Sequence, residues 1–187
     1  MTVHRTRPLP RAKLRGSYKL APNLIKQTQR ALYSFFQAGR YEGGHEGICY
    51  WAGREESDLT FLEAVIVPEA HHERFGVFVS AAGFGEAARR ARGMGLGVLA
   101  QVHSHPGSDV RHSDGDDDLI VMPFENMLSV VAPHYGRTLR SIADCGVHQF
   151  QDHRWVHCDP ESVAPTFGRI RPWHRWAARL RRTRQPK

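Results

Sequence analysis

The sequence predicts an α/β (α+β) protein in which a mixed β-sheet is flanked by helices. Apolar runs of strand length recur between turn residues, and two segments carry apolar residues at helical spacing. These two segments, residues 23–38 and 80–93, lie among the strands instead of forming a separate block. The chain has 187 residues, of which 41% are hydrophobic. This size and composition predict one domain with a core, extended by tails.

The first half of the chain predicts two helices and three strands. Asn23 is a suitable cap for the first helix, and Gly39 follows its expected end. Strands are expected at residues 46–52 and 59–68, and the polar turn between them favours a hairpin. A further strand at residues 75–79 precedes the second helix.

The second half predicts a series of strands interrupted by one short helix. That helix follows the region of Ser113 and ends before Pro123. The strands are expected at residues 96–102, 127–132, 137–143, 146–151 and 155–157, the last two as a hairpin.

Positive charge is concentrated at the two ends of the chain. Residues 1–20 contain six basic residues and residues 169–187 contain eight, with no acid in either, whereas 12 basic and 19 acidic residues lie between them. We therefore expect a basic N-terminal extension (1–20), a central domain (21–158) and a basic C-terminal tail (159–187). We expect residues 1–20 to be irregular, residues 173–182 to form a short basic helix, and neither residues 1–16 nor residues 173–187 to supply core. Such tails can contact an acidic surface, dock on the domain or remain solvated.

Membrane and disulfide signals are missing from this sequence. No apolar run approaches transmembrane length, and the basic N-terminus lacks the apolar segment of a secretion signal. The three cysteines, Cys49, Cys145 and Cys158, form no C-x-x-C pair. We expect a cytoplasmic protein with reduced thiols, in which Cys49 is a small core residue.

A His-x-His pair at a predicted strand end indicates a metal site. His103 and His105 are two residues apart, so on a strand both imidazoles project from one face. Ser113 follows after seven residues and Asp116 three later, which places these two on one face of a helix. Two imidazoles and a carboxylate are the ligands of a catalytic zinc that keeps a fourth position open. Alternatively, the histidines are solvated and Ser113 and Asp116 form a helix-capping box; capping is also compatible with metal binding.

The spacing His103-x-His105, seven residues, Ser113-x-x-Asp116 resembles the JAMM motif of the JAB/MPN metalloproteases (MPN+ type, bacterial branch). The segment from Glu46 to Gly53 is similar to the family's upstream glutamate and strand, although Cys49 stands where many members have glycine. The resemblance covers roughly residues 21–157 and implies a three-layer, cytidine-deaminase-like fold. It implies a Zn²⁺ ion held by His103, His105 and Asp116.

The resemblance also implies the catalytic roles. Glu46 would be the general acid–base and Ser113 would donate a hydroxyl to the developing oxyanion. Glu42 is the alternative base. Asp109, Asp114 and Asp117 are alternative ligands, although none keeps the motif spacing.

The expected function is hydrolysis of a peptide or isopeptide bond at the C-terminal tail of a ubiquitin-like protein, as in a deubiquitinase. The alternatives are a related hydrolase that processes the tail of a sulfur-carrier protein and a non-catalytic MPN scaffold. A zinc deaminase is disfavoured, because its His-x-Glu and Pro-Cys-x-x-Cys pattern is missing from the sequence. By analogy with bacterial relatives of similar size, activating and conjugating enzymes are expected partners.

Overall fold

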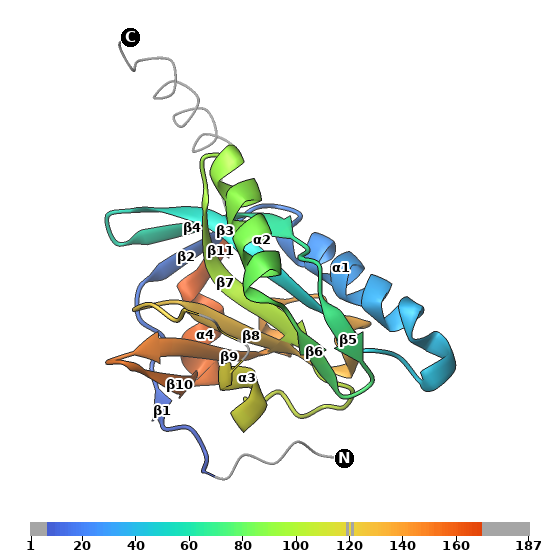
Figure 1. Ribbon diagram of the computed structural model, residues 1–187. Coiled ribbons are helices and arrows are strands. Elements are labelled where there is room, and N and C mark those ends of the chain that lie inside the picture. Colours follow the sequence, from blue (N-terminus) through green and yellow to red (C-terminus); the bar gives the residue numbers. More distant parts are fainter. Residues whose placement is uncertain (1–6, 119, 121, 170–187) are drawn as a thin grey trace.

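The structure is a computed structural model that describes residues 7–118, 120 and 122–169. Within these residues a nine-stranded mixed sheet and a two-stranded hairpin are combined with four α-helices (Figure 1). In chain order the elements are β1 (Arg11–Ala12), β2 (Ser17–Leu20), α1 (Leu24–Ala38), β3 (Ile48–Glu56), β4 (Leu59–Ile66), β5 (His71–Glu73), β6 (Gly76–Phe78), α2 (Ala81–Gly93), β7 (Gly97–Ser104), α3 (Asp114–Asp118), β8 (Leu128–Ala132), β9 (Gly146–Gln151), β10 (Arg154–Cys158), α4 (Pro160–Thr166) and β11 (Phe167–Arg169). Short 3-10 turns occupy Arg40–Glu42, His134–Gly136 and Ile142–Asp144.

The main sheet has the order β1-β10-β9-β8-β7-β3-β4-β2-β11. β7 lies at its centre, antiparallel to β3 and parallel to β8. The hairpins β3–β4 and β9–β10 are antiparallel, which confirms both predicted hairpins. The predicted mixed sheet with flanking helices is therefore confirmed.

The two faces of the sheet bury different side chains. On β3, Cys49 and Trp51 point into the main apolar core, which α1 and α4 cover through residues such as Leu32 and Val163. Tyr50 and Ala52 alternate with them and pack against α2 on the other face. Cys49 is thus the small core residue that was expected. α3 lies on the face of α2, and the site described below is on this face.

Two local expectations are wrong. Asn23 precedes α1, but its side chain makes no capping hydrogen bond. Residues 137–143 form no strand: the Asp144 carboxylate accepts the N–H groups of Arg140 and Ser141, and the Ser141 hydroxyl accepts that of Ala143. These side chains accept hydrogen bonds from backbone N–H groups that a β-strand would donate to a neighbouring strand, which favours a turn.

The ends of the central domain are more ordered than the sequence suggested. The expectation that residues 1–20 are irregular is wrong for the described part, because β1 pairs with β10 and β2 pairs with β4. At the other end, β11 pairs with β2. The division of the chain at residues 20 and 158 stays a prediction, and the predicted helix at 173–182 lies outside the described residues.

Polar side chains bind the N-terminal segment to the sheet. The Gln149 side chain accepts the backbone N–H of Arg15 at 2.9 Å and donates to its carbonyl at 3.1 Å. Gln151 donates to the carbonyl of Lys13 at 2.9 Å, and Leu14 between them is buried in the main core. The expectation that this end supplies no core is therefore wrong. No apolar pattern in the sequence indicated this, because basic residues surround Leu14.

Among the described residues, no helix combines the length and apolar character that membrane crossing requires.

Leu14→Ala should destabilise the protein by about 2–4 kcal/mol, because it removes a buried side chain and leaves a cavity under the N-terminal segment. The neighbouring exposed residue provides the control: Lys13→Ala should change the free energy of unfolding by less than about 0.5 kcal/mol. Chemical denaturation of both variants measures the difference. Equal stability of Leu14→Ala and the wild type would mean that residues 7–16 do not contribute to the folded core.

Candidate metal centre

The antiparallel pairing of β3 with β7 brings Glu46 to the histidines. Ile48 pairs with His103, so the residue two before Ile48 comes opposite the residue two after His103, which is His105. Two further bonds join the strand ends: Ser104 donates its backbone N–H to the Gly47 carbonyl at 3.0 Å, and its hydroxyl accepts the Gly47 N–H at 2.9 Å. The backbone N–H of Glu46 is bound by the Glu73 carbonyl of β5 at 2.8 Å.

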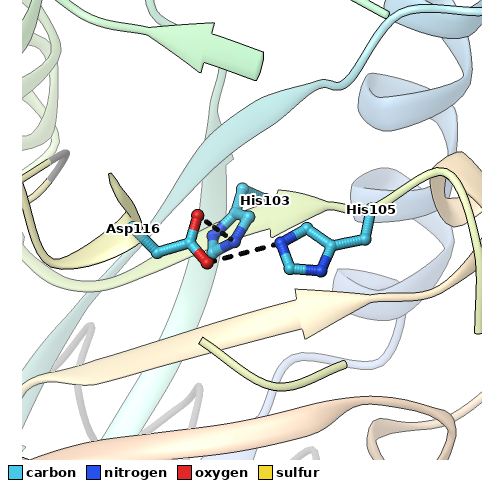
Figure 2. A group of neighbouring side chains, drawn as sticks. All are labelled: His103, His105 and Asp116. Carbon is cyan, nitrogen blue, oxygen red and sulfur yellow. Dashed lines mark ion pairs between the residues drawn. The ribbon is translucent and has the colours of Figure 1, made fainter. Parts of the chain in front are cut away.

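Two histidines from β7 and its extension meet one carboxylate from α3. Figure 2 shows the Asp116 carboxylate pointing at both imidazoles. Its Oδ1 lies 3.2 Å from Nε2 of His103, and its Oδ2 lies 3.4 Å from Nε2 of His105. One ligand atom from each of the three residues lies within 4.8 Å of the other two, and all three residues are buried. Residues 13 positions apart in the chain thus form one compact group.

The predicted capping box is present at the start of α3. The Ser113 backbone N–H donates to Oδ2 of Asp116 at 2.6 Å, and the Ser113 hydroxyl accepts the Asp116 N–H at 3.1 Å. Capping satisfies donors at the helix N-terminus and fixes the Asp116 carboxylate beside the histidines. The expected oxyanion role of Ser113 stays a prediction.

A carbonyl outside the group fixes the orientation of the His105 ring. Its Nδ1 lies 2.9 Å from the carbonyl oxygen of Asp109. A carbonyl can only accept, so Nδ1 carries the hydrogen and the neutral ring has its lone pair at Nε2, toward Asp116. Asp109 itself is held by Arg111, whose guanidinium lowers the pKa of this carboxyl to about 2.

The charges of the group shift its pKa values in opposite directions. Burial favours the neutral form of Asp116, but the charge of His103 and hydrogen bonds with His103 and His105 outweigh it, so the pKa of Asp116 is strongly lowered. Burial likewise opposes charge on His105, yet Asp116 and Glu46 raise the pKa of His105. Burial raises the pKa of Glu46 to about 8, which the charge of His105 partly offsets. Glu46 therefore titrates close to neutrality, as a group that exchanges protons should.

The donor set fits a metal ion. Within the described part of the chain, Nδ1 of the fully buried His103 and Oε1 of Glu46 have no hydrogen-bond partner, and Nε2 of His103 has only the Asp116 carboxylate, 3.2 Å away. Buried polar atoms normally have hydrogen-bond partners. Under-bonded atoms of His103 and Glu46 beside the Asp116 carboxylate therefore indicate a site for a further ligand. Two imidazoles and one carboxylate are also the donors that zinc accepts while keeping an open position.

Among the comparisons with known proteins, the name of one curated relative supports a metal site. No protein-family model matches the chain. A protein of Sinorhizobium fredii named as a probable metalloprotease is 33% identical over 98 residues, which are 50% of this chain and 60% of that protein. A Desulfitobacterium hafniense protein solved in solution aligns with 84% of this chain and 97% of its own at 14% identity, with a TM-score of 0.60, and so shares the fold. A JAB1/MPN domain protein from Archaeoglobus fulgidus aligns with 83% of this chain and 98% of its own, at 15% identity and a TM-score of 0.43.

The group of His103, His105 and Asp116 and the name of the Sinorhizobium relative both support the resemblance to the JAMM/MPN metalloproteases. The match spans only about 60% of the length of that curated relative.

The alternative residues lie outside the group of His103, His105 and Asp116. Glu42 is 70% exposed at its side chain and contacts Nε2 of His45 at 3.1 Å. Asp109 is paired with Arg111, and Asp117 contacts His112. Asp114 is exposed at the start of α3.

Sequence reasoning missed a buried polar row beside the group. Gln101 of β7, Ser129 of β8, His148 of β9 and His157 of β10 are successive cross-strand neighbours on the face that carries His103. His112 lies over this row, stacked on His148 with ring centroids 4.2 Å apart. The alternation of Ser129 with Leu128 and Val130 was the available signal, but strand order is needed to align it with the histidines.

The purified protein should bind about one zinc ion per chain, and His103→Ala and Asp116→Ala should each lose it, because three ligands are the minimum for a tight site. His71→Ala, at a histidine with a 75% exposed side chain, should bind zinc like the wild type. Elemental analysis after dialysis measures the ratio. Wild-type protein that stays metal-free when zinc is supplied at neutral pH would contradict the site.

Glu46→Gln should stabilise the metal-free protein at alkaline pH. A carboxyl with a raised folded pKa contributes full stability below its unfolded pKa, near 4.5, and this contribution is lost as the pH rises through about 8. The variant's free energy of unfolding should therefore match that of the wild type near pH 4.5 and exceed it by up to about 5 kcal/mol above pH 8, since a shift from 4.5 to about 8 is worth about 1.4 kcal/mol per pKa unit. Urea denaturation in chelator across this range tests it, with Glu42→Gln at an exposed carboxyl as control. A stability difference that does not vary with pH would rule out a raised pKa.

Proposed function

We propose that this protein is a JAMM-type zinc metallopeptidase that hydrolyses a peptide or isopeptide bond at the C-terminal tail of a ubiquitin-like protein. The observation that carries the proposal is the buried group of His103, His105 and Asp116, with the titratable carboxyl of Glu46 facing it. The name of the Sinorhizobium relative supports the peptidase part. The choice of a ubiquitin-like substrate comes from the family resemblance.

His103, His105 and Asp116 would hold the ion. Zinc supplies Lewis acidity, which lowers the pKa of a bound water and polarises the scissile carbonyl. Only one ligand is anionic, so the set neutralises little of the charge of the ion. The Asp109 carbonyl holds the His105 ring with Nε2 turned inward, which keeps that ligand in its binding orientation.

Glu46 would move the proton. Its carboxylate would take a proton from the attacking water and return it to the leaving amine nitrogen, and a pKa near neutrality suits both steps. The bonds that hold Gly47 to Ser104 and Glu46 to Glu73 keep this carboxyl at a constant position relative to His105. The Ser113 hydroxyl would donate a hydrogen bond to the oxyanion that develops on the scissile carbonyl.

A catalyst is favoured over a scaffold by this arrangement. A scaffold has no requirement for an anionic ligand buried between two imidazoles, an arrangement whose desolvation is costly. The sulfur-carrier alternative uses the same residues on a different tail, so the substrate test includes both proteins. Activating and conjugating enzymes encoded with such a substrate are the proposed partners.

Glu46→Gln should keep its zinc and lose about two to four orders of magnitude in the rate of tail cleavage, because the amide cannot accept a proton. The substrates are a ubiquitin-like protein and a sulfur-carrier protein, each fused through its C-terminal glycine to a reporter. Zinc content is measured in the same samples.

Ser113→Ala provides the contrast. It should lower the rate by about a hundredfold if the hydroxyl serves the oxyanion, and should cost about 1 kcal/mol of stability through the lost cap. Undiminished cleavage by zinc-loaded Glu46→Gln would overturn the assignment of the base. If the wild-type protein cleaves neither fusion, the proposed substrates are wrong.

A further inference from the structure

A chain of three polar side chains links strand β8 to the short helix α3. Nε2 of His112 lies 2.7 Å from the hydroxyl of Ser129 on β8, and Nδ1 of His112 lies 2.9 Å from Oδ1 of Asp117 in α3. The backbone N–H of His112 also donates to Nε2 of His148 at 3.3 Å. His112 is thus bound to two strands of the sheet on one side and to α3 on the other.

These residue types match a serine-hydrolase triad, but the arrangement cannot act as one. The hydroxyl, imidazole and carboxylate stand in the order that activates a serine nucleophile. Ser129 is fully buried in the sheet, and His112 is only 2% exposed, so no substrate carbonyl can reach the hydroxyl. The chain of contacts must therefore serve a different purpose, which follows from what it connects.

α3 depends on tertiary contacts for its position. It has five residues, Asp114–Asp118, and a helix of this length is not stable by itself. Its sequence is acidic and offers the core no apolar side chain. Asp116 and Asp117 are consecutive residues of α3. Asp116 is the proposed metal ligand, and Asp117 contacts His112, which in turn contacts Ser129 of the sheet.

We propose that His112 is a positioning residue for the metal centre, holding α3 against β8 through Asp117 so that the Asp116 carboxylate faces His103 and His105. The inference rests on the proposed function, because it assigns a role around the same site. Partners of metal ligands that fix their orientation usually change metal affinity about 10–100-fold when they are removed. Here the support acts through the helix backbone and not through the ligand itself.

The first experiment measures zinc affinity by competition with a chromophoric chelator. His112→Phe keeps a ring of similar size and removes both nitrogen contacts, and should weaken zinc binding about 10–100-fold. His112→Asn keeps a donor for Asp117 and should recover most of this loss. His157→Phe is the matched control: it lies in the same row of the sheet, contacts His148 and should bind zinc like the wild type. Cobalt spectra of the same variants should change only where the ligand geometry changes.

A second measurement needs no metal. In the metal-free protein, His112→Phe should speed the hydrogen exchange of the Ser113 and Asp116 amides, which the capping box protects. The same variant should leave exchange in the β9–β10 hairpin unchanged. A merely structural role would instead lower protection throughout the sheet.

The outcomes separate this inference from the proposed function. If the wild type binds no zinc, the proposed function fails, and exchange at α3 still decides whether His112 holds the helix. If the wild type binds zinc and His112→Phe binds it equally tightly, the positioning role is wrong. If His112→Phe does not fold, Ser129→Ala and Asp117→Ala decide. Alanine is used at Asp117 because an asparagine amide oxygen could still accept the His112 hydrogen bond. Ser129→Ala and Asp117→Ala should each weaken zinc binding about tenfold, and the double variant should bind zinc about as tightly as the weaker-binding single variant, because both changes break one chain of contacts.

Discussion

The antiparallel register between β3 and β7 is the constraint on which the site depends. It aligns Ile48 with His103, and the strand ends beyond this pair then bring Glu46 opposite His105. A shift of one residue would turn every side chain of β3 to the other face of the sheet, exchanging Cys49 and Trp51 with Tyr50. The apolar core on one face therefore enforces the geometry of the polar site on the other.

The site concentrates buried polar groups that would be costly elsewhere. Asp116 stays ionised in spite of its burial because two imidazoles and the Ser113 N–H compensate its charge. Glu46 lacks comparable donors, so burial raises the pKa of its carboxyl. Two acidic residues on the same site thus differ in protonation because of their surroundings. This difference fits the proposed roles, ligation for Asp116 and proton transfer for Glu46.

A polar row across β7, β8, β9 and β10 lies beside the site in the sheet. Burial lowers the pKa of His112 and of His148, so both rings are neutral at neutral pH and can accept as well as donate hydrogen bonds. A neutral ring between Ser129 and Asp117 can bind both at once without adding charge under the metal ligands. The sheet therefore provides a rigid support to α3, which has little stability of its own.

The sequence alone predicted which residues gather at the site, and the tertiary structure decided their supports. Local signals sufficed for the mixed sheet, both hairpins, helices α1 and α2 and the group of His103, His105 and Asp116, because strand alternation and helical spacing act over a few residues; they missed α4. The same signals failed at residues 137–143, where the side chains of Ser141 and Asp144 accept the backbone hydrogen bonds that a β-strand would make with its neighbour. They also failed at residues 11–20, whose strands pair with segments far along the chain. Nor could they pair His112 with Ser129 and Asp117, because that contact requires the order of β7, β8 and β9 in the sheet. Long-range pairing is set by burial of the whole core, and no short window of sequence contains that information.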